Sequence, residues 1–133
     1  MSDTEAYRAA VRLLAALDKT PAQLCARLTE KGFTKKDAAD AVARLESEGY
    51  LNERRYAEKT VGRLYNAYYG REYVLAYLKG KQFSKDALEY AEEYMQTLDF
   101  DAAAKEYAKK LLSLGKSKEQ IRAAMYRRGL LEN

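Results

Sequence analysis

The residues of this chain that could bind a charged partner are basic, and three of them share one helical face. Arg55, Lys59 and Arg63 are spaced four residues apart, so a helix presents them as one stripe of positive charge. That helix is predicted to span residues 52–69 and to begin at Asn52. Its apolar residues lie nearly opposite the stripe. Because an arginine in the first helical turn opposes the helix dipole, Arg55 favours a functional surface over a merely solvated one.

Charge alternates in blocks along the rest of the chain. Residues 54–81 carry seven basic and two acidic side chains, residues 86–106 one basic and seven acidic, and residues 107–128 seven basic and one acidic. The two basic blocks could form one positive face for phosphate or for an acidic protein groove. Charged outer faces are also ordinary on helices of any soluble bundle, so both interpretations stay open. The candidate partner- or DNA-binding residues are Arg55, Lys59, Arg63, Arg71, Lys79, Lys81, Arg122, Arg127 and Arg128.

The sequence lacks the usual residues of catalytic and metal sites. It contains no His, which removes the commonest general base and the commonest metal ligand. It has no Gly-rich phosphate loop, no Cys-x-x-Cys pair and no ion-binding loop. We therefore expect a protein that is not an enzyme, with no catalytic residues, no metal, no cofactor and no small-molecule substrate. Catalysis by carboxylates alone is not excluded.

The expected location is the cytoplasm. The chain has no apolar stretch long enough to span a membrane and no signal-peptide pattern at its acidic N-terminus. Its one cysteine, Cys25, cannot form an internal disulfide, which suits a reducing compartment. We expect Cys25 to be a buried or half-buried structural thiol, because it has no basic neighbour in sequence that would lower its pKa.

An internal repeat predicts the architecture. The stretches LCARLTEKGF (24–33), VLAYLKGKQF (74–83) and IRAAMYRRGL (121–130) share one pattern of apolar and basic positions. Capping boxes at Thr20 and Ser117 open the first and third of these helices. Each unit adds a leading helix, and the first two units add a third helix after Thr34 or Ser84. The prediction is an all-α single domain of three tandem three-helix modules, at about 1–51, 52–97 and 98–133, with the last lacking its third helix. Such an array is elongated and curved.

The tyrosines have two possible roles. Tyr56, Tyr68 and Tyr107 fall on predicted inner faces, which favours packing in the core. Tyr65 and Tyr69 interleave with the basic stripe, where tyrosine is typical both of cores and of binding surfaces. Arg128 lies near the apolar face of its own helix, so it could be structural or could contact a partner.

Two segments resemble the RecX family. In 31–58 the resemblance is carried by Gly49-Tyr50-Leu51, Asn52-Glu53 and Tyr56-Ala57, and in 111–130 by Arg127-Arg128-Gly129. The chain departs from the family pattern at Asn52, where Asp is usual, and at Lys81-Gln82. The resemblance implies a repeat of three-helix units and a non-catalytic regulator. Family members bind the RecA recombinase filament on single-stranded DNA and restrain its ATPase and strand-exchange activities.

Two other functions are compatible with the residues. One is a stand-alone nucleic-acid-binding protein, although no single helix carries the concentrated base-reading side chains of a recognition helix. The other is a helical-repeat adaptor for an unrelated protein, for which the repeats alone would suffice.

Overall fold

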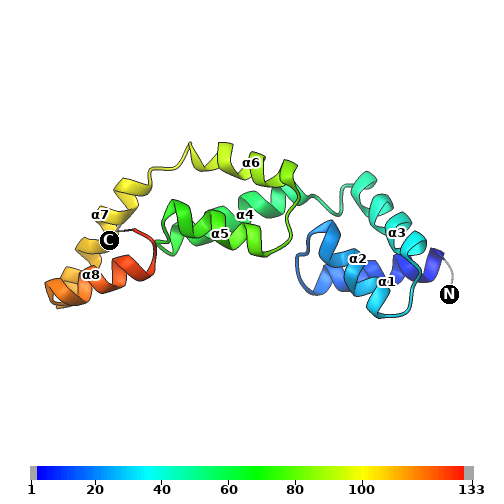
Figure 1. Ribbon diagram of the computed structural model, residues 1–133, viewed down its shortest axis with the longest axis horizontal. Coiled ribbons are helices and arrows are strands. Elements are labelled where there is room, and N and C mark those ends of the chain that lie inside the picture. The colour runs from blue at the N-terminus through cyan, green and yellow to red at the C-terminus, as the bar shows by residue number, and fades with distance from the viewer. Residues whose placement is uncertain (1–2, 131–133) are drawn as a thin grey trace.

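The computed structural model describes residues 3–130, and its regular structure in that range is entirely helical (Figure 1). Short turns join the helices, and residues 3–130 contain no strand. The helices are α1 (Asp3–Ala16), α2 (Pro21–Glu30), α3 (Lys35–Ser47), α4 (Glu53–Asn66), α5 (Arg71–Gly80), α6 (Lys85–Met95), α7 (Phe100–Ser113) and α8 (Lys118–Arg127).

Helices α2, α3, α4, α6 and α8 begin where the sequence predicts, because local side-chain bonds satisfy their first N–H groups. Both predicted capping boxes form: Thr20 accepts from the backbone of Gln23, Ser117 accepts from Gln120, and each Gln side chain accepts in return from the cap backbone. Asn52 accepts from the Arg55 amide at 3.0 Å and so starts α4. Thr34 and Ser84 cap α3 and α6 in the same way.

The first module, α1 to α3, encloses one apolar core. Leu24 and Leu28 on α2 are fully buried against the apolar residues of α3 and against alanines of α1. The chain leaves this module through Leu51, which is itself buried in the core, and Asn52 opens α4 immediately after it. The buried residues are Ala6, Ala9, Ala10, Leu24, Leu28, Ala38, Ala41, Val42, Leu45 and Leu51.

The second module, α4 to α6, repeats this arrangement around its own core. Val74 and Leu78 of α5 are fully buried, at the positions that correspond to Leu24 and Leu28 of α2. A carboxylate ties the module together at one end: Glu53 accepts from the Ser84 backbone N–H at 2.8 Å and from its hydroxyl at 2.7 Å. The buried residues are Ala57, Val61, Leu64, Val74, Leu78, Phe83, Ala87, Ala91 and Met95.

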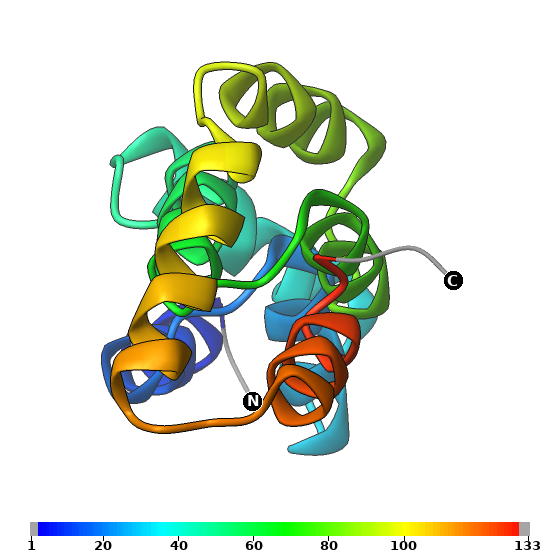
Figure 2. The ribbon, with the colours of Figure 1, turned by 90° about the vertical axis from the view of Figure 1, so that its left-hand side faces the viewer.

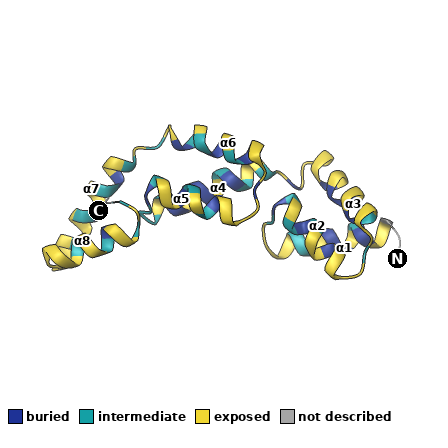
Figure 3. Ribbon diagram, in the orientation of Figure 1, coloured by how far each residue is buried: buried dark blue, intermediate teal, exposed yellow. Residues whose placement is uncertain are grey.

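The third module, α7 and α8, buries much less apolar surface (Figure 3). Ala103, Tyr107 and Met125 are its buried apolar residues within the described chain. At its tip Leu112 and Leu114 remain 66% and 64% exposed. A pair of helices with so small a core depends on its neighbour for stability, as terminal units of helical arrays do.

The three modules follow one another along an elongated, curved body (Figure 1). Viewed along the long axis, α2, α5 and α8 lie on one side and α1, α4 and α7 lie on the other (Figure 2). The predicted fold class, an elongated all-α array of helical repeats, is confirmed.

The structure corrects the predicted end of the fourth helix. The expected span 52–69 is too long, because α4 ends at Asn66 and Ala67 is its C-cap. Tyr68 then adopts a φ of 67°, in the left-handed region that turns the chain toward α5. The apolar periodicity of the sequence continues past Asn66. Such periodicity does not predict that a residue other than glycine will adopt a left-handed conformation.

Candidate partner-binding surface

The predicted stripe on α4 forms a basic and aromatic face together with α5. Arg55, Lys59 and Arg63 are all exposed, as the helical spacing required. The Arg63 guanidinium lies 5.7 Å from the ring centre of Tyr77 on α5 and donates to its hydroxyl at 3.3 Å. From the other end of α5, Lys81 places its ammonium 5.2 Å from the same ring. Tyr77 therefore gathers two cations that are separated by 18 positions in the sequence.

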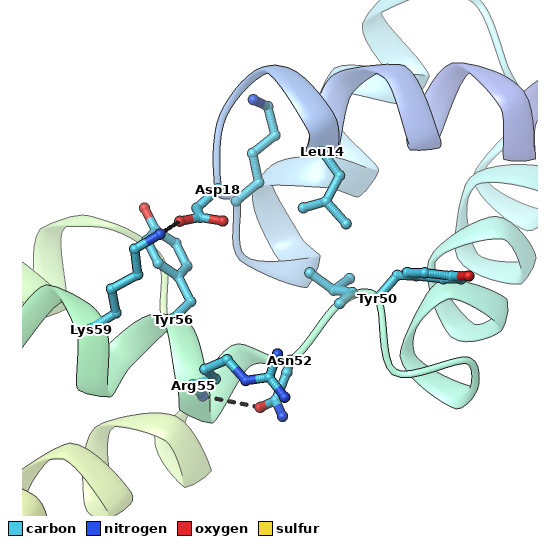
Figure 4. Close-up of a pocket in the computed structure, with 9 residues that line it drawn as sticks. Leu14, Asp18, Tyr50, Asn52, Arg55, Tyr56 and Lys59 are labelled. Atoms are coloured by element: carbon cyan, nitrogen blue, oxygen red, sulfur yellow. Dashed lines mark hydrogen bonds and ion pairs between the residues drawn. The ribbon is translucent and has the colours of Figure 1, made fainter.

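The other end of the stripe lies where the first and second modules meet. There the Lys59 ammonium forms an ion pair with Asp18, at 2.8 Å, across the junction (Figure 4). A pocket of about 220 Å³ opens beside this pair, and Arg55 lines it together with Lys59. Burial raises the pKa of Tyr56, whose ring forms part of the pocket wall and contacts Phe83.

Arg128 has a structural role at the junction of the second and third modules. Its guanidinium donates to the Tyr107 hydroxyl at 2.9 Å and to the backbone carbonyl of Ala67. The same group lies 4.7 Å from the ring centre of Tyr69 and 5.0 Å from that of Tyr107. Its own carbonyl accepts from Gly70 N–H at 2.6 Å. Of the two roles left open by the sequence, the structure supports the structural one, because the guanidinium already bonds two acceptors and lies against two tyrosine rings.

Tyrosines reinforce this second junction. Tyr68 stacks on Tyr107 with ring centres 4.9 Å apart, and its hydroxyl donates to Glu106 at 3.1 Å, which raises the pKa of Tyr68. Tyr65 donates to the Asp99 carbonyl at 3.1 Å and meets Phe100 edge-on. Tyr65 and Tyr68 therefore both pack between the second and third modules. For Tyr65, the contacts favour a packing role over the alternative role in a binding surface.

The remaining candidates are placed as follows. Arg71 is half-buried at the start of α5 and lies 3.6 Å from Glu72. The Gly70 N–H donates to the Arg128 carbonyl across the second junction. Arg71 and Arg127 are the adjacent residues in sequence, so they lie beside this junction. Lys79 and Arg122 are exposed on α5 and α8. The structure therefore places Arg55 and Lys59 at the first junction and Arg128 at the second, and the length of the second module separates the two junctions (Figure 1).

The basic residue that flanks the stripe is neutralised within its own module. Arg54 donates to both carboxylate oxygens of Asp86, at 2.9 and 2.8 Å, and lies 5.3 Å from the ring centre of Tyr90. This two-pronged hydrogen bond lowers the pKa of Asp86 and raises that of Arg54. Arg54 thus connects α4 to the acidic helix α6, whereas Arg55 points to the module junction.

Sequence reasoning missed Asp18 as a part of this surface. Asp18 lies in the turn between α1 and α2, outside every periodic pattern, and its partner Lys59 is 41 positions away. Nothing in the sequence connects the two residues. A carboxylate in a loop carries no signal of its own until the neighbouring module is placed beside it.

The described residues contain neither a candidate metal site nor a candidate membrane span. Residues 3–130 contain no group of three or more His, Cys, Asp or Glu side chains that could hold a metal ion. No helix within the same residues is long and apolar enough to cross a membrane. Cys25 is half-buried, as expected, and burial raises the pKa of its thiol.

Comparisons with known proteins match the first module most directly. Residues 6–45, which run from α1 to α3, match the family model for the first three-helix domain of RecX. A protein of Trichlorobacter lovleyi named Regulatory protein RecX is 47% identical over 58 residues, which are 44% of this chain and 38% of that protein. The aligned segment is thus less than half of the relative's length.

Solved structures extend the match to the fold of the whole chain. The crystal structure of RecX from Lactobacillus salivarius has a TM-score of 0.65 at 16% identity, and the match covers 97% of both chains. A second crystal structure, of a regulatory protein RecX, has a TM-score of 0.70 at 16% identity and covers 96% of this chain and 64% of the other. At such identity the likeness shows the fold alone. Sequence and fold together confirm the resemblance to the RecX family.

Proposed function

We propose that this chain, similar in sequence and fold to the RecX regulatory proteins, binds the RecA recombinase filament on single-stranded DNA. Bound there, it restrains the filament's ATPase and strand-exchange activities in recombination and repair. It does so by occupying surface on the filament, without chemistry of its own. The observation that carries the proposal is the basic and aromatic face of α4 and α5, set on an array whose fold matches RecX structures.

The arrangement suits a partner that is itself repetitive. A curved array presents its side chains at intervals along its length, so that separate modules reach separate subunits of a helical filament. Basic residues lie at both junctions, with the acidic helix α6 between them in sequence. Arginine and lysine there would form charge-assisted bonds with carboxylates of the filament or with DNA phosphates.

The test is the ATPase rate of a RecA filament on single-stranded DNA as the protein is titrated in. We expect inhibition at well below one molecule per RecA subunit. The variant Arg55→Glu/Arg63→Glu reverses two stripe residues and leaves the Lys59–Asp18 pair intact. The control Arg8→Glu/Arg12→Glu makes the same change of charge on exposed positions of α1. Inhibition should fall at least tenfold in the first variant and remain near wild type in the control.

Two outcomes would contradict the proposal. If both variants inhibit like wild type, the α4 stripe is not in the interface. If the wild-type protein is helical by circular dichroism but changes no RecA activity, the chain is not a filament regulator. Strong, steeply salt-dependent binding to DNA without RecA would then favour the stand-alone nucleic-acid-binding function, and absence of both activities would favour the adaptor.

A further inference from the structure

The two module junctions hold their basic residues in different ways. At the second junction Arg128 is half-buried, lies against two tyrosine rings and donates to the Tyr107 hydroxyl and to a backbone carbonyl, so its guanidinium is engaged within the chain. At the first junction Lys59 meets Asp18 in the open, with side chains 70% and 45% exposed. Water and salt screen such a pair, and its carboxylate can be replaced by another at little cost.

The pocket beside this pair is built from both modules (Figure 4). Lys59 and Arg55 come from α4 of the second module, whereas Asp18 and Leu14 come from the first. The Lys59 ammonium points at the Asp18 carboxylate, and the Arg55 side chain extends beside Asn52 at the start of α4 (Figure 4). Three basic residues of the lining, Lys19, Arg55 and Lys59, thus share the pocket with one carboxylate, that of Asp18.

The pocket walls combine charged and polar side chains with apolar and aromatic ones. Leu14, the buried Leu51 and the rings of Tyr50 and Tyr56 line it around the charged groups. Tyr50 is 71% exposed, so one aromatic wall of the pocket is open to solvent. Its small size, its three basic residues and the apolar surface of Leu14 and Leu51 beside them suit a side-chain carboxylate with its methylene stem better than a sugar–phosphate backbone, which needs an open groove.

We infer that this inter-module pocket is a binding site for an acidic side chain of a partner protein, which takes the place of Asp18 on Lys59. In the free protein the Asp18 carboxylate pairs with Lys59, and the partner's carboxylate displaces it on binding. Arg55 supplies a further cation on the pocket wall, so that the partner's carboxylate gains a contact in addition to the one with Lys59. The identification of the natural partner as the RecA filament rests on the proposed function, but the site itself does not.

The test measures binding of fluorescein-labelled poly-L-glutamate by anisotropy, without any recombinase. Asp18→Asn removes the internal carboxylate at nearly constant size and leaves Lys59 available. Asp40→Asn is the matched control, because Asp40 forms a similar exposed pair with Lys36 at 3.1 Å on α3, away from the pocket. Both variants change the net charge equally. A labelled thymidine oligonucleotide of equal charge serves as the nucleic-acid probe.

We expect Asp18→Asn to bind poly-L-glutamate about two- to fivefold more tightly than Asp40→Asn, the range that corresponds to losing one exposed ion pair. In the Lys59→Gln background this difference should disappear, because the released cation is then missing. The oligonucleotide should show no difference between the two variants.

Three results would overturn the inference. Equal affinities of the two variants for poly-L-glutamate would mean that Asp18 does not occupy a binding site for a carboxylate. A gain that persists in the Lys59→Gln background would mean that Lys59 is not the group released. A larger gain for the oligonucleotide than for poly-L-glutamate would assign the pocket to phosphate instead. RecA inhibition by the wild-type protein is measured separately, so failure of this site and failure of the proposed function are distinguishable.

Discussion

Replacing Arg128 tests whether this residue holds the third module in place or contacts a partner. In the structure its guanidinium bonds the Tyr107 hydroxyl and the Ala67 carbonyl and lies against two tyrosine rings. Arg128→Ala removes all of these contacts. Arg128→Lys keeps the positive charge but loses the planar fork that reaches two acceptors at once. A role in steering a partner depends on charge, whereas a structural role depends on the fork.

The expected loss follows from the contacts. A hydrogen bond from a charged donor contributes about 1.5–3 kcal/mol, and a cation–π contact at a partly exposed site about 0.5–1 kcal/mol. Because these contacts share one side chain and are not additive, we expect Arg128→Ala to cost about 2–4 kcal/mol and Arg128→Lys about half of that. The third module buries few apolar residues, so the loss should appear there as local opening of α7 and α8.

Hydrogen exchange followed by NMR separates the modules. In Arg128→Ala the backbone amides of Tyr107 and Met125 should exchange about 30- to 1,000-fold faster, which is the factor that 2–4 kcal/mol implies. The amide of Leu28, in the core of the first module, is the internal reference and should not change. Wild-type exchange at Tyr107 and Met125 in both variants, combined with lost RecA inhibition in Arg128→Ala alone, would refute the structural role and restore Arg128 to the binding surface.

The other predictions concern backbone approach, pH and thiol reactivity. Gly70→Ala should lower the melting temperature by several degrees, because its new Cβ would overlap the backbone that faces it across the second junction. Gly62→Ala has open space around its new Cβ and should gain about 0.5–1 kcal/mol of stability from helix propensity. Equal melting temperatures of the two variants would contradict this prediction. Arg54 lowers the pKa of Asp86, so the stability from this pair is present at neutral pH and lost as the pH falls through the depressed pKa. In urea unfolding, the free energy of unfolding of Asp86→Asn should therefore fall less at acid pH than that of the wild type. Parallel pH dependences of the two proteins would refute the assignment. Burial raises the pKa of Cys25, so it should react with a disulfide reagent at pH 8 several times more slowly than the same thiol in urea; equal rates would show that the thiol is not protected in the folded chain.

The binding surface was predictable only in part. Arg55, Lys59 and Arg63 share one exposed face because helical spacing alone puts residues four apart on one side. The same spacing could not reveal that Arg63 and Lys81 meet at Tyr77, since that contact depends on how α5 packs on α4. Nor could it separate the exposed cations from Arg128, whose partners lie up to 61 positions away.

The sequence by itself determined the helices and their grouping into repeats. Caps at Thr20, Ser84 and Ser117 bond residues three positions away, and apolar stripes recur every three or four residues, so these features depend on local geometry that the residue types specify. Only the tertiary structure decided what happens between modules. The Lys59–Asp18 pair and the enclosure of Arg128 by tyrosines arise where helices distant in the sequence meet, and no local periodicity encodes the angle at which one module is placed on the next.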